Sequence, residues 1–310
     1  MLNIYRFSGL MLSCSLLAWA QNPSPAGHPA QMVVTTGHSY GHQSALLTAA
    51  DLTVTQHYEA VPITRVVPLR GDRAGIEMFV LVDNCSNCEV NSKVEELRRF
   101  ISSQPPTTAI GVAYIRDGRV EIGEKPTRDH QRAVNALSPP TGSKPSGPFL
   151  ALADLIKEWG PDPSRHVVLM MTNGVDPNAS DWQPNPSADA AIEAAQRAGV
   201  TVYAIYNPSA DYMASDFSKL YAGQVQMAHV AAETGGEAYF VSFGPLPSLA
   251  PFLADISEHL GNRYLVEFLA NPDEAPGGLQ EITVRAKTDV ELMVPSKVFV
   301  PAPAGGGGSR

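Results

Sequence analysis

Two cysteines directly follow a strongly apolar segment and could carry redox chemistry. The run Ile76–Val82 is almost continuously apolar and ends at Asp83, after which Cys85 and Cys88 form a C-x-x-C pair. At a helix start such a pair can act as in thioredoxin-like proteins, because the helix terminus lowers the pKa of the first cysteine. In an oxidising compartment the pair is expected to be a static disulfide. Asp83, two residues before the first cysteine, and the lack of an aromatic residue leading into the pair favour the static disulfide. If the pair is redox-active instead, the protein is a periplasmic thiol-disulfide oxidoreductase.

Two other patterns resemble sites of catalysis or metal binding. The segment Gly37–Gly41 matches the G-x-S-x-G nucleophile elbow, but few residues precede Ser39, whereas a hydrolase needs earlier strands and an oxyanion loop. His28, His38 and His42 lie in a polar segment rich in Pro and Gly, which is more typical of a solvated arm than of a metal site. We therefore assign no catalytic residue to this region.

The first residues have the features of a secretion signal. Arg6 precedes the apolar stretch Ser8–Leu17, and the small residues of Ala18-Trp19-Ala20 fit a signal peptidase site. A lipoprotein signal that uses Cys14 is the alternative. We expect a secreted or periplasmic protein after cleavage near Ala20.

Composition excludes several classes of function. The chain is 44% hydrophobic and 17% charged, as expected for a globular protein with a real core. Its net charge of -9 argues against nucleic acid as the main ligand, since phosphate binding needs clustered Lys and Arg. No later run reaches the roughly 18 apolar residues of a membrane span, so no membrane insertion is expected.

Strand-like and helix-like segments alternate through the centre of the chain. His166–Thr172 and Val200–Ile205 read as buried strands, with a helical pattern over Ala188–Ala198 between them. This predicts an α/β fold with a doubly wound, mostly parallel sheet. The expected parts are a signal peptide (1–20), a flexible arm (21–46), N-terminal β-strands (47–75), the α/β domain (76–262), a C-terminal antiparallel β module (263–300) and a flexible tail (301–310).

Four motifs in order along this domain resemble von Willebrand factor A-like domains: Val80–Asp83, Val167–Gly174, Ala198–Ile205 and Ala232–Gly236. Together with the flanking strands, they resemble an exported subgroup known mainly from acidobacterial genomes. The resemblance implies a Rossmann-like fold and a non-enzymatic binding or adhesion module with a protein partner. It also implies a metal-ion-dependent adhesion site, in which an Asp-x-Ser-x-Ser loop, a Thr and an Asp hold a divalent ion.

The chain departs from that adhesion site at most ligand positions. Asp83 matches, but Cys85 and Asn87 replace the two serines, Ser146 is the hydroxyl nearest to the second-loop position, and Asn173 replaces the third-loop Asp. Losing a carboxylate weakens the attraction for a hard cation. We expect no cofactor and no tightly bound Mg²⁺; any ion that does bind would use Asp83, Asn87, Ser146 and Asn173.

Ligands of doubly wound folds bind at the carboxyl ends of the strands. We therefore expect a partner-binding surface there, clamped by the Cys85–Cys88 disulfide. The residues predicted to contact the partner are Asp83, Ser86, Asn87, Ser146, Asn173 and Asp176.

A static disulfide predicts that the exported protein contains no free thiol and does not reduce insulin. Thiol titration of the denatured protein and an insulin-reduction assay measure both properties. Insulin reduction that disappears in Cys85→Ser would instead support the oxidoreductase.

Overall fold

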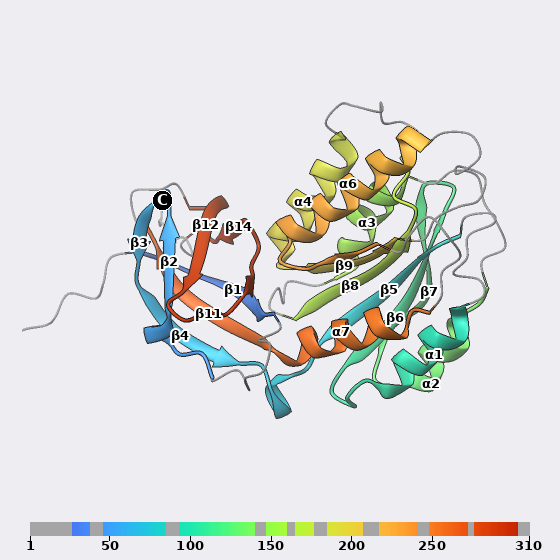
Figure 1. Ribbon diagram of the computed structural model, residues 1–310, viewed down its shortest axis with the longest axis horizontal. Helices are drawn as coiled ribbons and strands as arrows, with labels where there is room; N and C mark the ends of the chain where they lie inside the picture. Colours follow the sequence, from blue (N-terminus) through green and yellow to red (C-terminus); the bar gives the residue numbers. More distant parts are fainter. Residues whose placement is uncertain are drawn as a thin grey trace, which may run out of the picture.

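The computed structural model describes residues 27–37, 46–84, 93–139, 147–159, 165–176, 185–206, 217–240, 248–271 and 276–302. They form an α/β core and a β-sandwich that lie side by side (Figure 1). Among these residues, no helix is both long enough and apolar enough to cross a bilayer.

A six-stranded sheet forms the centre of the core. Its order is β10-β9-β8-β5-β6-β7, and all neighbouring strands pair in parallel except β6 and β7. This confirms the predicted doubly wound, mostly parallel sheet. The strands are β5 (Glu77–Asp83), β6 (Ala109–Arg116), β7 (Arg119–Thr127), β8 (His166–Thr172), β9 (Thr201–Tyr206) and β10 (Ala238–Tyr239).

Helices cover both faces of this sheet (Figure 1). Along β5, Val80 and Val82 join the apolar cluster on the side of α1, α2 and α7, whereas Phe79 and Leu81 join the cluster beneath α3, α4 and α6. Burial on both faces explains why the strands are apolar throughout. The helices are α1 (Val94–Ser103), α2 (His130–Ala136), α3 (Pro148–Ile156), α4 (Pro186–Ala198), α6 (Phe217–Glu233) and α7 (Ala250–Gly261).

Segments from both ends of the described chain build the β-sandwich. One antiparallel sheet has the order β13-β1-β11-β4 and the other β14-β12-β2-β3, with a shared apolar core between them. The short helical turn η1 (Ala49–Asp51) precedes β2, and η2 (Gly71–Arg73) lies between β4 of the sandwich and β5 of the core. The strands are β1 (His28–Thr36), β2 (Leu52–Gln56), β3 (Glu59–Val61), β4 (Ile63–Pro68), β11 (Arg263–Ala270), β12 (Gly278–Ala286), β13 (Leu292–Met293) and β14 (Lys297–Val300).

Strand β1 begins four residues before the possible strand Met32–Thr36 that the sequence indicated within the otherwise loosely ordered arm of residues 21–46. Ala30, Met32 and Val34 alternate with more exposed residues and are buried in the sandwich core. Met32 lies opposite Val266 in β11, and Val34 opposite Tyr264. The alternation of buried and exposed residues is that of a strand with one face in the core. Because β1 pairs with β11, the N-terminal and C-terminal β modules expected from the sequence form one sandwich.

The junction between core and sandwich is short, because Asn262 is the only residue between α7 and β11. Its carbonyl oxygen accepts hydrogen bonds from the backbone N–H (3.1 Å) and the hydroxyl (3.4 Å) of Thr36. The Arg263 side chain that follows is 1% exposed, and burial lowers the pKa of its guanidinium to about 10. Backbone hydrogen bonds and burial therefore hold β11 where α7 ends.

Glu96 of α1 links two helices on one face of the core. Its Oε2 accepts hydrogen bonds from Ser248 Oγ (2.7 Å), Leu249 N (2.8 Å) and Ala250 N (3.0 Å) at the start of α7. Burial raises the pKa of Glu96, but these hydrogen bonds and nearby Lys93 outweigh that effect, and its pKa is lowered overall. An ionised carboxylate here satisfies helix-terminal N–H groups and complements the helix dipole.

Glu96→Gln should reduce the free energy of unfolding by about 1–2 kcal/mol at neutral pH, because the variant keeps an acceptor but loses the charge. The folded-state pKa lies below the ordinary value of 4.5. The contribution is therefore fully present above that value and disappears as the pH falls through the folded-state pKa. Urea unfolding at several pH values should show that the difference in free energy of unfolding between the wild type and Glu96→Gln becomes smaller at acidic pH.

The matched control is Glu95→Gln, since the Glu95 side chain is 72% exposed and pairs with Arg98 at the surface. It should cost less than about 0.5 kcal/mol. If the loss of unfolding free energy in Glu96→Gln does not change with pH, the ionised Glu96 carboxylate does not stabilise the start of α7.

Candidate functional site

The carboxyl ends of β5 and β8 bring two buried polar side chains together. Asp83 ends β5, and Thr172 ends β8, its parallel neighbour in the sheet. The Thr172 hydroxyl donates a hydrogen bond of 2.7 Å to Asp83 Oδ2, and both residues are fully buried. Because a buried carboxylate is costly without donors, this bond stabilises the charge and joins the two strand ends.

The turn that follows β8 is fixed by local hydrogen bonds. Thr172 Oγ1 accepts from the N–H of Gly174 (3.1 Å), and Asn173 Oδ1 accepts from the N–H of Val175 (2.9 Å). Gly174 has a φ of 69°, and a Cβ there would lie 2.5 Å from the carbonyl oxygen of Gly223 in α6. Only glycine fits this close contact between the turn and the helix.

The structure brings three of the predicted partner-binding residues to one edge of the sheet. Asp83 ends β5, and Asn173 and Asp176 lie in the turn after β8; none is more than 5% exposed. Their side chains are therefore buried in this conformation and are not presented to a partner. The other predicted residues, Cys85, Ser86, Asn87, Cys88 and Ser146, lie outside the described residues.

Two oxygen atoms at this edge that could bind a cation already accept hydrogen bonds within the protein. Asn173 supplies no charge, and its amide oxygen already accepts a hydrogen bond from Val175 N. Asp83 Oδ2 is likewise engaged by the Thr172 hydroxyl. A hard cation would have to compete with both contacts for oxygen ligands.

Tyr206 adds an apolar wall at the same end of the sheet. It ends β9, its side chain is fully buried, and its ring lies 6.2 Å from that of Phe240, tilted by 49°. Burial raises the pKa of Tyr206 to about 12, so the phenol stays neutral. This edge therefore combines the carboxylates of Asp83 and Asp176 with neutral polar and aromatic groups.

Sequence reasoning missed two features that the structure makes clear. Thr172 was assigned only to a strand, although a Thr that ends a buried strand opposite Asp83 is well placed as a donor. Glu237, Asp255 and His259 were not singled out, yet they lie close together at the opposite end of the sheet. The spacing of four residues between Asp255 and His259 on a helix was the available signal.

A pocket of about 280 Å³ lies between α4 and the β-sandwich. Its walls come from segments that are distant in the sequence, so no local pattern predicted it. The lining is largely apolar and includes Met32, Val33, Ala195, Val200, Leu265 and Phe299.

No profile of a protein family matches the sequence, and no curated protein matches it. Among solved structures, this chain is similar to a von Willebrand factor type A protein from Catenulispora acidiphila, with 10% sequence identity and a TM-score of 0.45. The alignment spans 89% of this chain and 74% of that protein. An aerotolerance-related membrane protein from Bacteroides fragilis is 15% identical, covers 60% and 98% of the two chains, and has a TM-score of 0.43. Values this low support no statement about activity or partners.

The core itself has a von Willebrand factor A-like fold, as the sequence resemblance implied. Its parallel sheet carries one antiparallel edge strand, β7, and helices on both faces. Asp83 lies at the end of the central strand β5, next to the Asn173-Gly174 turn. The fold alone does not fix a function.

Thr172→Val should lower the free energy of unfolding by about 1–3 kcal/mol, because it keeps the shape of the side chain but leaves the buried Asp83 carboxylate without this donor. Thr172→Ser retains the hydroxyl and should lower the free energy of unfolding by less than Thr172→Val does. Chemical denaturation of the two variants tests this, and equal losses would show that the hydroxyl contributes little.

Proposed function

We propose that this chain is an exported, non-enzymatic module that binds a protein partner through the loops at the carboxyl ends of its core sheet, without a tightly bound metal. The observation that carries the proposal is the hydrogen bonding at the strand ends that lead into those loops, where Thr172 holds Asp83 and the Asn173 side chain closes its own turn. Such support favours a preorganised binding surface, which reduces the ordering cost of association.

The connectivity of the sheet supports the location of this surface. At their carboxyl ends, β5, β8, β9 and β10 lead, directly or after a few residues, into the segments 85–92, 177–184, 207–216 and 241–247, which lie outside the described residues. In open α/β sheets, ligands bind outside this edge. The buried residues at the strand ends anchor the start of two of these loops.

Burial argues against a catalytic role for the polar residues at this edge. A general acid or base has to reach the proton that it transfers. Asp83 is fully buried, and Asp176 is 5% exposed. Binding through the loops above them fits this arrangement better than chemistry at these carboxylates.

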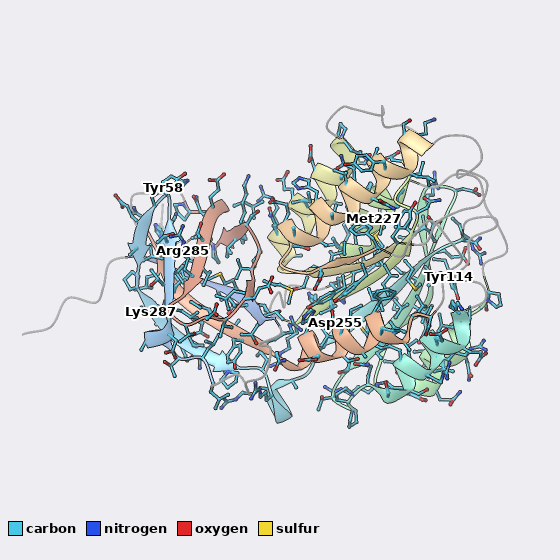
Figure 2. All side chains as sticks on the ribbon, viewed as in Figure 1. Tyr58, Tyr114, Met227, Asp255, Arg285 and Lys287 are labelled. Carbon is cyan, nitrogen blue, oxygen red and sulfur yellow. The ribbon has the colours of Figure 1, made fainter. Side chains whose placement is uncertain are left out.

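Site-specific photo-crosslinking tests the proposed surface. A photoreactive residue at Ser86 or Asn87 should capture a defined protein from an extract of the native cell envelope. The same residue at Tyr58 is the control, because Tyr58 is fully exposed on the β-sandwich, away from this edge of the core (Figure 2). Equal capture from Tyr58 would contradict the assignment.

Asp83→Ala should reduce this capture by about tenfold or more, since it removes the anchor beneath the loops. Asp154→Ala, at a half-exposed position on α3, should leave capture unchanged. Circular dichroism and thermal unfolding establish that both variants are folded. Undiminished capture by a folded Asp83→Ala protein would count against the site.

A further inference from the structure

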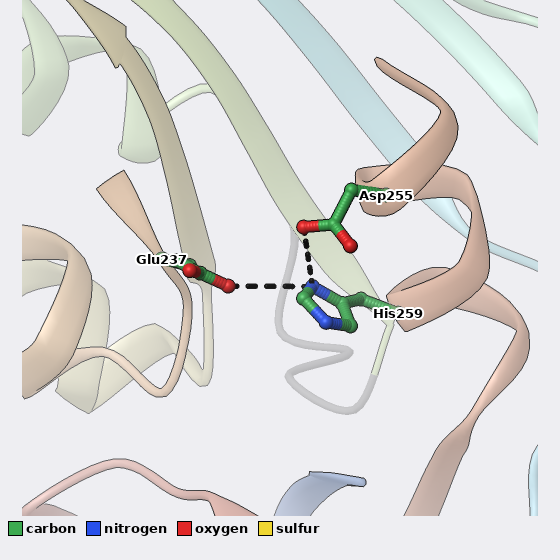
Figure 3. Close-up of side chains that lie close together, drawn as sticks. All are labelled: Glu237, Asp255 and His259. Carbon is green, nitrogen blue, oxygen red and sulfur yellow. Dashed lines mark ion pairs between the residues drawn. The ribbon is translucent and has the colours of Figure 1, made fainter. Parts of the chain in front are cut away.

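A second polar cluster lies at the amino end of the core sheet, close to the β-sandwich. Glu237 directly precedes β10, and Asp255 and His259 project from one face of α7, one turn apart (Figure 3). Asp255 is seen near the junction of the two parts of the molecule (Figure 2). Tyr239 of β10 completes the cluster. This end of the sheet is opposite to the proposed partner-binding loops.

The side chains converge on His259 Nδ1. This atom lies 3.7 Å from Glu237 Oε2 and 4.0 Å from Asp255 Oδ2 (Figure 3). All three candidate ligand atoms lie within 4.8 Å of one another. Both nitrogen–oxygen separations exceed the roughly 2.7–3.2 Å of a direct hydrogen bond.

These separations approach those of ligands around one ion. Zn²⁺ binds imidazole nitrogen and carboxylate oxygen at about 2.0–2.2 Å, which in a tetrahedron places the ligand atoms about 3.4 Å apart. The distances of His259 Nδ1 from Glu237 and Asp255 exceed this value by about 0.3 and 0.6 Å, and the two carboxylate oxygens lie within 4.8 Å of each other. Small side-chain movements would bring the three atoms onto one ion.

Neighbouring aromatic residues hold two of these side chains in place. The Tyr239 hydroxyl donates a 2.6 Å hydrogen bond to Asp255 Oδ2, and its oxygen lies 3.4 Å from His259 Nδ1. The Tyr203 ring stacks on the His259 imidazole at 6.1 Å, with 21° between the planes. Metal ligands are commonly oriented by such outer partners.

Charge and exposure also suit a cation. The carboxylates of Glu237 and Asp255 supply negative charge beside the His259 imidazole. The His259 side chain is 3% exposed, whereas those of Glu237 and Asp255 are 45% and 25% exposed. The cluster is thus anchored by a buried imidazole and open to solvent through its carboxylates.

We propose that Glu237, Asp255 and His259 form a binding site for a divalent first-row transition ion, with Zn²⁺ as the best match. An imidazole ligand selects such ions over Mg²⁺ and Ca²⁺, which prefer all-oxygen sites. Three protein ligands leave a fourth position for water or a ligand from another molecule. The ion would join β10 to α7 just before the chain enters β11.

Calorimetric titration of the mature, oxidised protein with ZnCl₂ tests this site. The wild type should bind one ion per chain at this site, and Glu237→Gln and Asp255→Asn should each weaken binding by at least about tenfold. Glu237→Gln replaces a half-exposed side chain and should fold, which thermal unfolding without zinc will establish. Co²⁺ gives a second readout, because its visible absorption reports four-coordinate geometry.

Glu193→Gln, at an exposed carboxylate on α4, is the matched control and should bind Zn²⁺ as the wild type does. The proposal is overturned if the wild type shows no saturable binding. It is equally overturned if binding persists undiminished in both Glu237→Gln and Asp255→Asn, since the ion would then lie elsewhere, for example on the histidines near His28.

Discussion

The antiparallel pairing of β1 with β11 is the interaction on which the rest of the structure depends. It runs from His28 opposite Ala270 to Thr35 opposite Arg263, and β4 pairs with the other edge of β11. Since β11 starts one residue after α7, this pairing ties the last helix of the core to strands from the N-terminal part of the chain. One β-sandwich thereby replaces two separate flanking modules.

This arrangement gives the two ends of the core sheet different environments. At the carboxyl end, the strands lead into connecting segments, and the Thr172 hydroxyl donates a hydrogen bond to the Asp83 carboxylate where two of these strands end. At the amino end, β10 and α7 approach the sandwich, and the side chains of Glu237 and His259 come together. A partner-binding surface and a metal site could therefore coexist on one core without sharing residues.

Much of the core could be predicted from sequence, because strands buried on both faces require continuous apolar runs such as Glu77–Asp83 and His166–Thr172. Asp83, Asn173 and Asp176 lie at one edge because neighbouring parallel strands end together there, and their role in partner binding remains a prediction. Their burial could not be predicted, because it depends on packing among distant elements. The cysteine pair remains a prediction.

Strand β1 shows the limit of local patterns. Its buried residues alternate correctly, but the segment is bordered by Pro and Gly, and its partner β11 lies more than two hundred residues away. Helix α2 was missed because it is short and buries only Ala133. The fully buried Arg263 is equally invisible to periodicity, since a charged residue is normally read as exposed.

The most direct test of the account is an anomalous-diffraction experiment on crystals of the mature protein grown with Zn²⁺ and Mg²⁺, with data collected on both sides of the zinc absorption edge. The account predicts zinc density between Glu237, Asp255 and His259 and no ion at Asp83. An ion bound to Asp83, or no zinc at the amino end of the sheet, would contradict it.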